Sequence, residues 1–159
     1  MSSVASGSAD GSHRRATVGV KQALREVDAQ LALLNRQVGG RLGLKDVDMD
    51  CLDLINAHGP LSPGALARRA GLHAATMTGI LDRLERAGWV SRERDPADRR
   101  AFLVRALRDR NAELLGHFAG MSAAVERICD DYPDTELERF TQFLHRIAEA
   151  GQTAARDLG

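Results

Sequence analysis

The stretch that decides the fold is residues 61–107, LSPGALARRAGLHAATMTGILDRLERAGWVSRERDPADRRAFLVRAL. Its first part predicts a short helix, Ser62–Ala70, in which Ser62 caps the first turn and Pro63 takes the first helical position. Gly71 is expected to end this helix, because helix termini commonly need a left-handed residue. A second helix and then two strands around an arginine-tipped loop follow. A helix-turn-helix followed by a charged hairpin is an arrangement that reads DNA.

The second helix, from about His73 to Ala87, is the predicted recognition helix. Its apolar residues recur at helical spacing, so one face packs inward and the other is left for a DNA major groove. The front of the helix, whose first turns would reach base edges, consists mostly of small residues. We therefore expect phosphate anchoring and DNA shape to matter more than direct readout of bases. The candidate contacts on this helix are His73, Ala74, Ala75, Thr76, Thr78 and Arg83.

Arg83 has two interpretations, which the sequence leaves evenly balanced. It is either a contact to a DNA phosphate or one half of an ordinary surface ion pair. In the second case its neighbours Asp82 and Glu85 would be the partners.

The loop of the hairpin carries the sharper signal. Asp95-Pro96-Ala97-Asp98 has the chemistry of a reverse turn, because proline fixes one torsion and aspartate bonds back to the backbone. Arg99 and Arg100 follow at once, and two guanidiniums on a narrow loop suit insertion into a DNA minor groove. Asp98 is expected to orient one of these arginines through a charge-assisted bond. The alternative is a solvated charged turn, which a preceding helix-turn-helix makes the minority interpretation.

Charge is unevenly distributed along the chain. The 159 residues carry no net formal charge, which argues against a generally adhesive polycation. Between residues 61 and 105, nine arginines outnumber five acidic residues, whereas residues 111–159 hold four arginines and nine acidic residues. A basic middle and an acidic end would orient the molecule on a polyanion.

The flanking sequence predicts a mainly α fold. Residues 1–15 form a polar head that is expected to be disordered, and residues 45–107 form the winged helix-turn-helix domain, with three helices and a small β-hairpin. Residues 16–44 and 108–159 hold long helices whose apolar stripes are too large to bury against so small a domain. We therefore expect a homodimer in which these dimerisation helices interleave across a two-fold axis. The alternative is an intramolecular bundle in a monomer.

Local signals set the expected ends of the flanking helices. Gly39-Gly40 is expected to stop the first of them. One continuous helix is predicted over about Arg108–Asp131. A capping box of Thr135 and Glu138 is expected to begin the last helix.

The sequence lacks the residue patterns of several other kinds of functional site. Cys51 and Cys129 lack metal or redox spacing, and Cys51 is expected to be a packed, inert thiol in a reducing cytoplasm. The five histidines are scattered, so we expect no metal site. Neither a signal peptide nor a bilayer-spanning run is recognisable, which predicts a cytoplasmic location and no membrane partner. No phosphate loop, nucleophile elbow or paired carboxylates stand out, so we expect neither an enzyme nor a cofactor.

The segment from Gly71 to Val90, together with Arg94–Ala101, resembles the MarR family of bacterial winged-helix regulators. The matching residues are Leu72, Thr76, Thr78, Asp82, Arg83, Leu84, Gly88, Val90, Asp95, Pro96, Asp98, Arg99 and Arg100. The resemblance implies an obligate dimer that binds double-stranded DNA at a pseudo-palindromic operator. It also implies a repressor that leaves the DNA when a small aromatic or phenolic ligand binds between the dimerisation helices and the DNA-binding lobe.

The front of the recognition helix departs from the family pattern. Ala74, Ala75 and Gly79 stand where the family usually has polar or basic residues, so the operator sequence does not follow from the resemblance. One alternative function is a winged-helix protein-interaction module that has lost DNA binding, although Arg99 and Arg100 speak against it. Another is a transcriptional activator of the same family. The residues that line the ligand cleft are not identifiable from one sequence.

Overall fold

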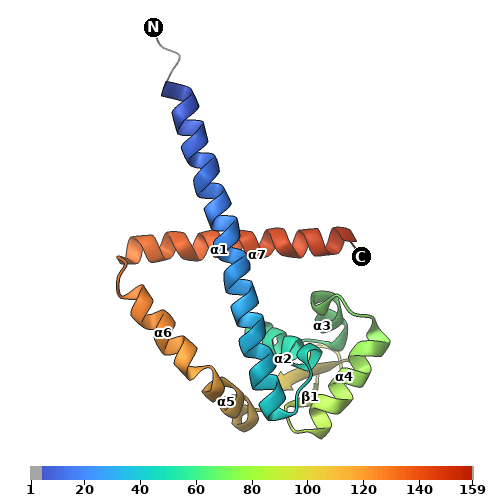
Figure 1. The fold of residues 1–159 in the computed structure, drawn as a ribbon. Coiled ribbons are helices and arrows are strands. Elements are labelled where there is room, and N and C mark those ends of the chain that lie inside the picture. Colours follow the sequence, from blue (N-terminus) through green and yellow to red (C-terminus); the bar gives the residue numbers. More distant parts are fainter. Residues whose placement is uncertain (1–4, 159) are drawn as a thin grey trace. The chain divides into compact units, whose positions relative to one another are not determined.

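The computed structural model describes residues 5–158 and consists of helices with one two-stranded antiparallel sheet (Figure 1). The elements are α1 (Ala5–Leu42), α2 (Asp46–His58), α3 (Pro63–Ala70), α4 (Ala74–Arg86), β1 (Val90–Arg94), β2 (Phe102–Ala106), α5 (Arg108–His117), α6 (Ala119–Cys129) and α7 (Asp134–Leu158). The chain divides into two compact units, Met1–Asp46 and Val47–Gly159. The predicted mainly α fold with a winged helix-turn-helix is confirmed.

The first unit is essentially one helix, and it differs from the prediction at both ends. Residues 1–4 of the head expected to be disordered lie outside the described residues, but from Ala5 onward the head is helical. Extending an existing helix costs far less than nucleating one, so a polar head can continue the amphipathic helix that follows it. The helix also runs through Gly39-Gly40 and ends at Leu42, and the next residue, Gly43, has the left-handed backbone that the Gly39-Gly40 pair lacks, with φ of 69°.

The second unit is built around the helix-turn-helix, whose helix ends follow the predicted local signals. The Ser62 side chain accepts a hydrogen bond from the backbone N–H of Ala65 at 3.2 Å, and Pro63 is the first residue of α3. Gly71 ends α3 in the left-handed conformation, with φ of 65°. The core beneath these helices consists of Met49, Cys51, Leu52, Ile55, Leu66, Ala67, Met77, Ile80, Leu81, Leu84, Trp89, Val90 and Val104.

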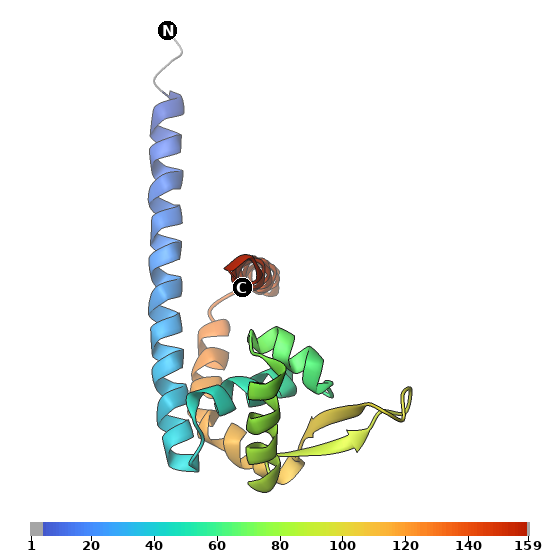
Figure 2. The ribbon, with the colours of Figure 1, turned by 90° about the vertical axis from the view of Figure 1, so that its right-hand side faces the viewer.

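The wing is a β1–β2 hairpin fastened to the helix-turn-helix at its base. Val90 pairs with Ala106 at the base, and Arg94 pairs with Phe102 next to the loop. Leu61, the residue before the α3 cap, exchanges two backbone hydrogen bonds with Val104 of β2, at 3.1 and 2.7 Å. The hairpin therefore projects from a base that shares a short ladder with the start of α3 (Figure 2).

The helices after the wing differ from the prediction in their boundaries. The expected helix over about Arg108–Asp131 is broken at Phe118, between two glycines that lower helix propensity, and becomes α5 and α6. Beyond Pro133, α7 already begins at Asp134, so Thr135 lies inside the first turn and is not the capping residue. None of the residues of α6 or α7 is buried in the single chain.

Candidate nucleic-acid interface

The front of α4 is an uncharged and open surface. Met77, Ile80, Leu81 and Leu84 are buried on one side of the helix, while the predicted contacts from His73 to Thr78 are exposed on the other. His73 lies at the N-cap position without a side-chain capping bond, so N–H groups of the first turn remain available to an anion. These N–H groups and the methyl groups beside them are what the front offers to a polyanion.

The two threonines on the front of α4 differ in their hydrogen bonding. The Thr78 hydroxyl donates to the backbone carbonyl of Ala74 at 3.0 Å. The Thr76 hydroxyl has no hydrogen-bond partner among residues 5–158, and its side chain is exposed. Thr76 is therefore the threonine on the front whose hydroxyl is free to donate to a base or phosphate.

One flank of α4 is tied to the wing. The guanidinium of Arg92 in β1 donates to Asp82 at 2.6 Å and to Glu85 at 3.0 Å. Asp82 and Glu85 are the residues expected as partners of Arg83 in a surface ion pair, and that expectation is wrong. The Arg92 side chain extends from β1 to both carboxylates on α4 and binds them in place of Arg83, their neighbour on the same helix.

The other flank of α4 is tied to α2 through Arg83. Its Nε donates to Oδ2 of Asp48 at 3.2 Å, and its Nη2 donates to Oδ1 of the same carboxylate. Asp48 is 1% exposed, whereas the Arg83 side chain is 39% exposed. The hydrogen bond to Asp48 raises the pKa of Arg83, so this side chain stays charged. Arg83 thus joins a buried carboxylate to the surface of the recognition helix.

The tip of the wing is ordered by two backbone turns. Asp95 Oδ1 accepts from the N–H of Ala97 at 2.8 Å, and Asp98 Oδ1 accepts from the N–H of Arg100 at 2.9 Å. Asp98 was expected to bond an arginine guanidinium, and this is wrong. The short aspartate side chain reaches the backbone two residues ahead instead, which is the geometry that its sequence position favours.

Arg94 closes the neck of the wing loop below these turns. Its Nη1 donates to the carbonyl of Arg99 at 2.8 Å, and its guanidinium lies 5.6 Å from the centre of the Phe102 ring. The guanidiniums of Arg99 and Arg100 are exposed and have no hydrogen-bond or ion-pair partner in the described part of the chain. The loop backbone is consequently fixed while both charges at its tip remain available to an anion.

Three residues of this arrangement, Asp48, Arg92 and Arg94, were missed by sequence reasoning. Asp48 lies in line with Leu52 and Ile55 on the buried side of α2, and a carboxylate on an apolar stripe signals a buried charge that needs a partner. Arg94 gave no comparable signal, because its role depends on where the loop carbonyl of Arg99 comes to lie.

Comparisons with known proteins agree with this geometry. A model of the MarR family matches residues 44–102, which include α2, α3, α4 and most of the wing. YcgE of Bacillus subtilis, an HTH-type transcriptional regulator, is 31% identical over 128 residues, covering 80% of this chain and 83% of the relative. The chain belongs to the MarR family. It is accordingly a DNA-binding transcriptional regulator.

Two further relatives place this MarR protein among regulators of known fold. The HTH-type transcriptional repressor YetL of Bacillus subtilis is 37% identical over 93 residues, covering 56% of this chain and 53% of the repressor. The crystal structure of a transcriptional regulator from Thermotoga maritima superposes with a TM-score of 0.61 at 26% identity. The match covers 86% of this chain and 96% of that regulator, so the similarity between the two structures includes the helices that flank the winged-helix domain.

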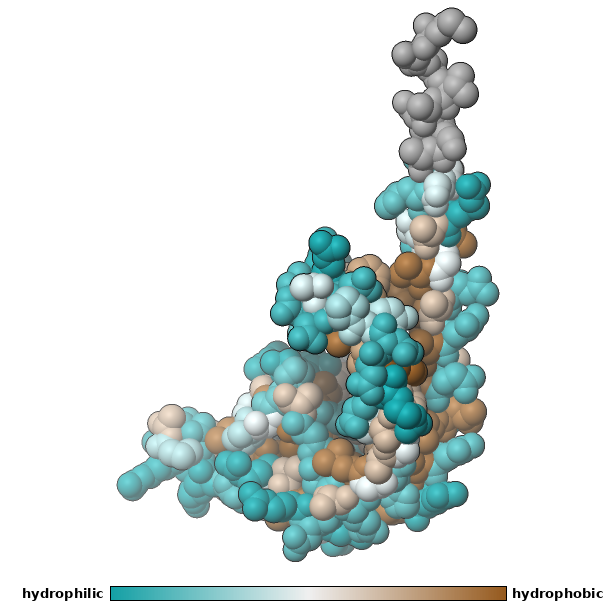
Figure 3. All heavy atoms as spheres, turned by 90° about the vertical axis from the view of Figure 1, so that its left-hand side faces the viewer, coloured by the Kyte–Doolittle hydropathy of each residue, from teal (hydrophilic) through white to brown (hydrophobic). Residues whose placement is uncertain are grey.

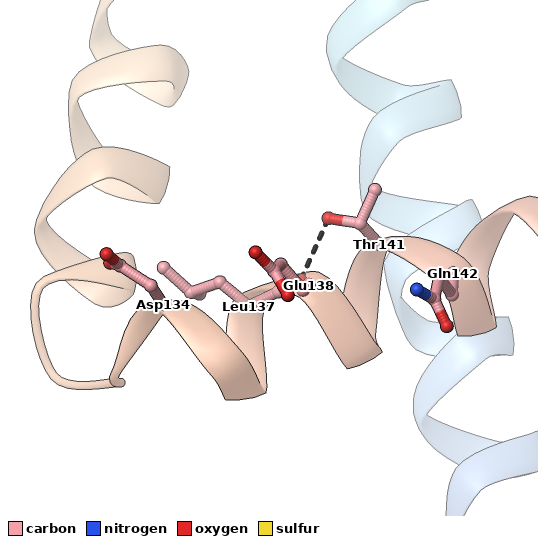
Figure 4. A pocket seen from close by; sticks show the side chains of 5 residues that line it. All are labelled: Asp134, Leu137, Glu138, Thr141 and Gln142. Atoms are coloured by element: carbon pink, nitrogen blue, oxygen red, sulfur yellow. Dashed lines mark hydrogen bonds between the residues drawn. The ribbon is translucent and has the colours of Figure 1, made fainter.

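The ligand cleft expected from the family resemblance stays a prediction. A hollow of about 420 Å³ is present on α7 (Figure 4), and its lining residues are Asp134, Leu137, Glu138, Thr141 and Gln142. All five come from one helix, and Thr141 uses its hydroxyl for the carbonyl of Leu137 at 2.9 Å. This open surface depression differs from a cleft between the dimerisation helices and the DNA-binding lobe.

Residues 5–158 of this MarR protein lack both a membrane-spanning helix and a metal-binding cluster. No helix in that range combines the length and apolar character that crossing a bilayer requires. The same range contains no group of three or more histidine, cysteine or acidic side chains arranged to hold a metal ion.

Proposed function

We propose that this MarR protein is a homodimeric repressor that binds a pseudo-palindromic operator, with α4 in the major groove and the wing in the adjacent minor groove. The observation that carries the proposal is the wing tip, where the guanidiniums of Arg99 and Arg100 are exposed on a loop held by three hydrogen bonds from side chains, besides its backbone bonds. A narrow minor groove concentrates negative potential, and an ordered loop brings both charges to it without first losing loop entropy.

The contacts we assign to DNA are those predicted from the sequence, with roles set by their surroundings. Arg99 and Arg100 would bind in the minor groove, and Asp98 would act through the backbone turn that it holds. His73, Ala74, Ala75, Thr76 and Thr78 would approach the major groove, where methyl groups can contact thymine and Thr76 can donate a hydrogen bond. Arg83 would contact a phosphate on the groove wall.

A homodimer is supported by apolar surface that the single chain leaves uncovered. Apolar side chains are exposed along α1, where Figure 3 shows brown patches below the grey residues, and also along α6 and α7. They include Val18, Val27, Leu31, Met121, Val125, Ile128, Phe140, Phe143 and Leu144. A second copy would bury these stripes and place two recognition helices about one helical turn of DNA apart.

Release by a small aromatic or phenolic ligand is the regulation that the family resemblance favours. Such a ligand would shift the dimer toward a spacing of its two lobes that no longer matches the operator. We propose that the protein works in the cytoplasm, where its DNA is. The ligand would be sought by screening for loss of DNA binding.

The deciding experiment is fluorescence anisotropy of the purified protein with a duplex from its own upstream intergenic region. A repressor should bind this duplex in preference to a random-sequence competitor, with two protomers per site and an affinity that falls steeply with salt. Absence of any preference, in a folded dimer that also occupies no other genomic site, would contradict the proposal.

A protein-interaction module is the second candidate, and the uncharged front of α4 favours it. Ala74, Ala75 and Gly79 are exposed without a charge among them. The double variant Arg99→Ala/Arg100→Ala separates the two functions, because a regulator loses DNA affinity whereas an interaction module keeps its protein partner. Repression and activation are distinguished by reporter transcription with and without the protein.

A further inference from the structure

The pair formed by Asp48 and Arg83 has a geometry that surface ion pairs lack. The carboxylate is buried at the start of α2, and it takes two hydrogen bonds from one edge of the guanidinium, through Nε and Nη2. Two parallel bonds fix the plane of a guanidinium as well as its position. The orientation of Arg83 is therefore set by α2, an element outside the recognition helix.

The opposite edge of Arg83 is free. Its Nη1 has no hydrogen-bond partner in the part of the chain that the structure describes, and the side chain is 39% exposed. A guanidinium carries five N–H donors, so two of them on Nη1 remain for an acceptor outside the chain. Because the bonded edge faces the buried carboxylate, the free Nη1 edge is the part of this half-exposed side chain that is left to solvent.

The free edge lies on a useful side of α4. Arg83 follows Thr76 by seven residues, which is two helical turns, so both belong to the same edge of the helix. Asp82 and Glu85, which bind Arg92, lie on the flank toward the wing. The Asp48 side of α4 is thus the flank away from the wing, where a helix in the major groove meets a phosphate wall.

We propose that Asp48 is a positioning residue for DNA binding, whose buried carboxylate aims the Nη1 edge of Arg83 at a DNA phosphate. This inference rests on the proposed DNA-binding role and deepens it. A buried pair of this kind need not stabilise the fold much, because desolvation of the carboxylate offsets most of the attraction. Orientation of a DNA contact is a function that stability alone does not require.

Removing the negative charge of Asp48 distinguishes a purely structural role of this residue from a role in positioning Arg83. Asp48→Asn removes a negative charge close to the DNA-facing helix while keeping the shape of the side chain. If the pair were only structural, a folded Asp48→Asn variant would bind the polyanion equally well or more tightly. If Asp48 aims Arg83, the same variant binds more weakly despite its gain in positive charge.

The test measures fluorescence anisotropy with a labelled random-sequence duplex and with the upstream intergenic duplex, at several salt concentrations. A phosphate contact should affect both duplexes alike, so we expect Asp48→Asn to weaken binding to each by about tenfold. Arg83→Gln should weaken binding by a similar factor and reduce the salt slope by about one. The double variant should bind no more weakly than Arg83→Gln alone, because the proposed effect of Asp48 on DNA binding runs through Arg83.

Two further variants serve as controls. Glu93→Gln removes a carboxylate from the exposed pair with Arg105, at 3.2 Å on the wing, and should not weaken binding. Arg83→Lys keeps the charge but cannot make two parallel bonds, and it should weaken binding even if Asp48→Asn proves too unstable to purify. Thermal unfolding of each variant establishes that binding is measured on folded protein.

The outcomes distinguish failure of this inference from failure of the proposed function. Wild-type protein that binds neither duplex overturns both. Wild-type binding with an Asp48→Asn variant of equal or higher affinity overturns the positioning role alone, and so do losses that simply add in the double variant. Full affinity of Arg83→Lys overturns it as well, because charge without orientation would then suffice.

Discussion

The front of α4 presents methyl groups and one free hydroxyl, whereas the tip of the wing presents two guanidiniums without partners. Both surfaces are rigidly supported: α4 is tied to the wing by Arg92 and to α2 by Asp48, and the wing loop is held by Arg94 and two aspartates. On the proposed mode of DNA binding, the difference teaches that affinity and discrimination would come from separate surfaces. The wing would supply charge that any DNA attracts, and α4 would supply shape and a few contacts that depend on sequence.

Removing both charges at the wing tip should have the largest effect. We expect Arg100→Ala alone to weaken binding by about 1–3 kcal/mol, and Arg99→Ala/Arg100→Ala to weaken it about a hundredfold and to flatten the salt dependence. Anisotropy titrations from low to physiological salt measure both quantities. The matched control is the adjacent arginine pair of α1, Arg14→Ala/Arg15→Ala, which lies outside the winged domain. Equal losses for the two double variants would contradict a special role of the wing.

Loosening the wing tip without changing its arginines should have a smaller effect. Asp98→Ala removes the acceptor for the Arg100 N–H, so the loop must be ordered on binding, at a cost of about 1 kcal/mol in affinity. Asp98→Asn retains the acceptor oxygen and should bind more tightly than Asp98→Ala. The salt slope should not fall for either variant, since both arginines remain. Equal affinity of the alanine and asparagine variants would show that preorganisation of this loop does not matter.

Substitutions on the front of α4 should change the preference of the protein for specific over random DNA. Thr76→Ala deletes the free hydroxyl and should reduce the preference for specific over random duplex by about 0.5–1.5 kcal/mol. Thr78→Ala is the matched control, because the Thr78 donor is already used by the Ala74 carbonyl. Competition titrations with random DNA measure the preference directly. If Thr78→Ala lowers it more than Thr76→Ala, the assignment of the two hydroxyls is wrong.

The last prediction concerns the stability of the core on which both surfaces rest, where no effect on DNA affinity is expected at neutral pH. Burial, with help from the nearby charges of Asp48 and Asp50, raises the pKa of Cys51 to about 11. The unfolded chain releases this proton at lower pH than the folded chain does, so stability should fall as pH rises from about 9 toward 11. Urea unfolding at pH 10 should show a loss of about 1 kcal/mol relative to neutral pH beyond that of Cys51→Ala. Identical pH dependence of the two proteins would contradict the shift.

Whether a feature was predictable from sequence depended on its range along the chain. Ser62, Pro63 and Gly71 act within a few residues, and the structure has the α3 boundaries that they predict. Gly39-Gly40 misled, because a glycine ends a helix only where the backbone turns left-handed, and Gly43 does so. The bond between Asp48 and Arg83 spans 35 residues and needs α2 folded against α4, so no local pattern names the partner.

The candidate site shows the same limit. The list of contacts on α4 and the wing could be made from residue types and helical spacing, and those residues are exposed as a binding surface requires, apart from the half-exposed Arg83. The roles of these residues could not be predicted, because a role depends on which neighbouring group forms each hydrogen bond in the folded chain. Asp98 bonds to backbone instead of a guanidinium, and Asp82 and Glu85 bond to Arg92 instead of Arg83.

The two backbone bonds between Leu61 and Val104 have a consequence for the kinetics of DNA binding by the helix-turn-helix and the wing of one protomer. Val104 of the wing forms a β-bridge with Leu61, the residue before the α3 cap. The helix-turn-helix and the wing are therefore two DNA-binding elements joined without a flexible linker, as in a rigid bivalent ligand. If α4 docks as proposed, the effective concentration of Arg99 and Arg100 at the neighbouring groove would depend on rigid geometry, and loss of either contact alone would be quickly reversed. Residence time on DNA should therefore be far longer than either contact could sustain by itself.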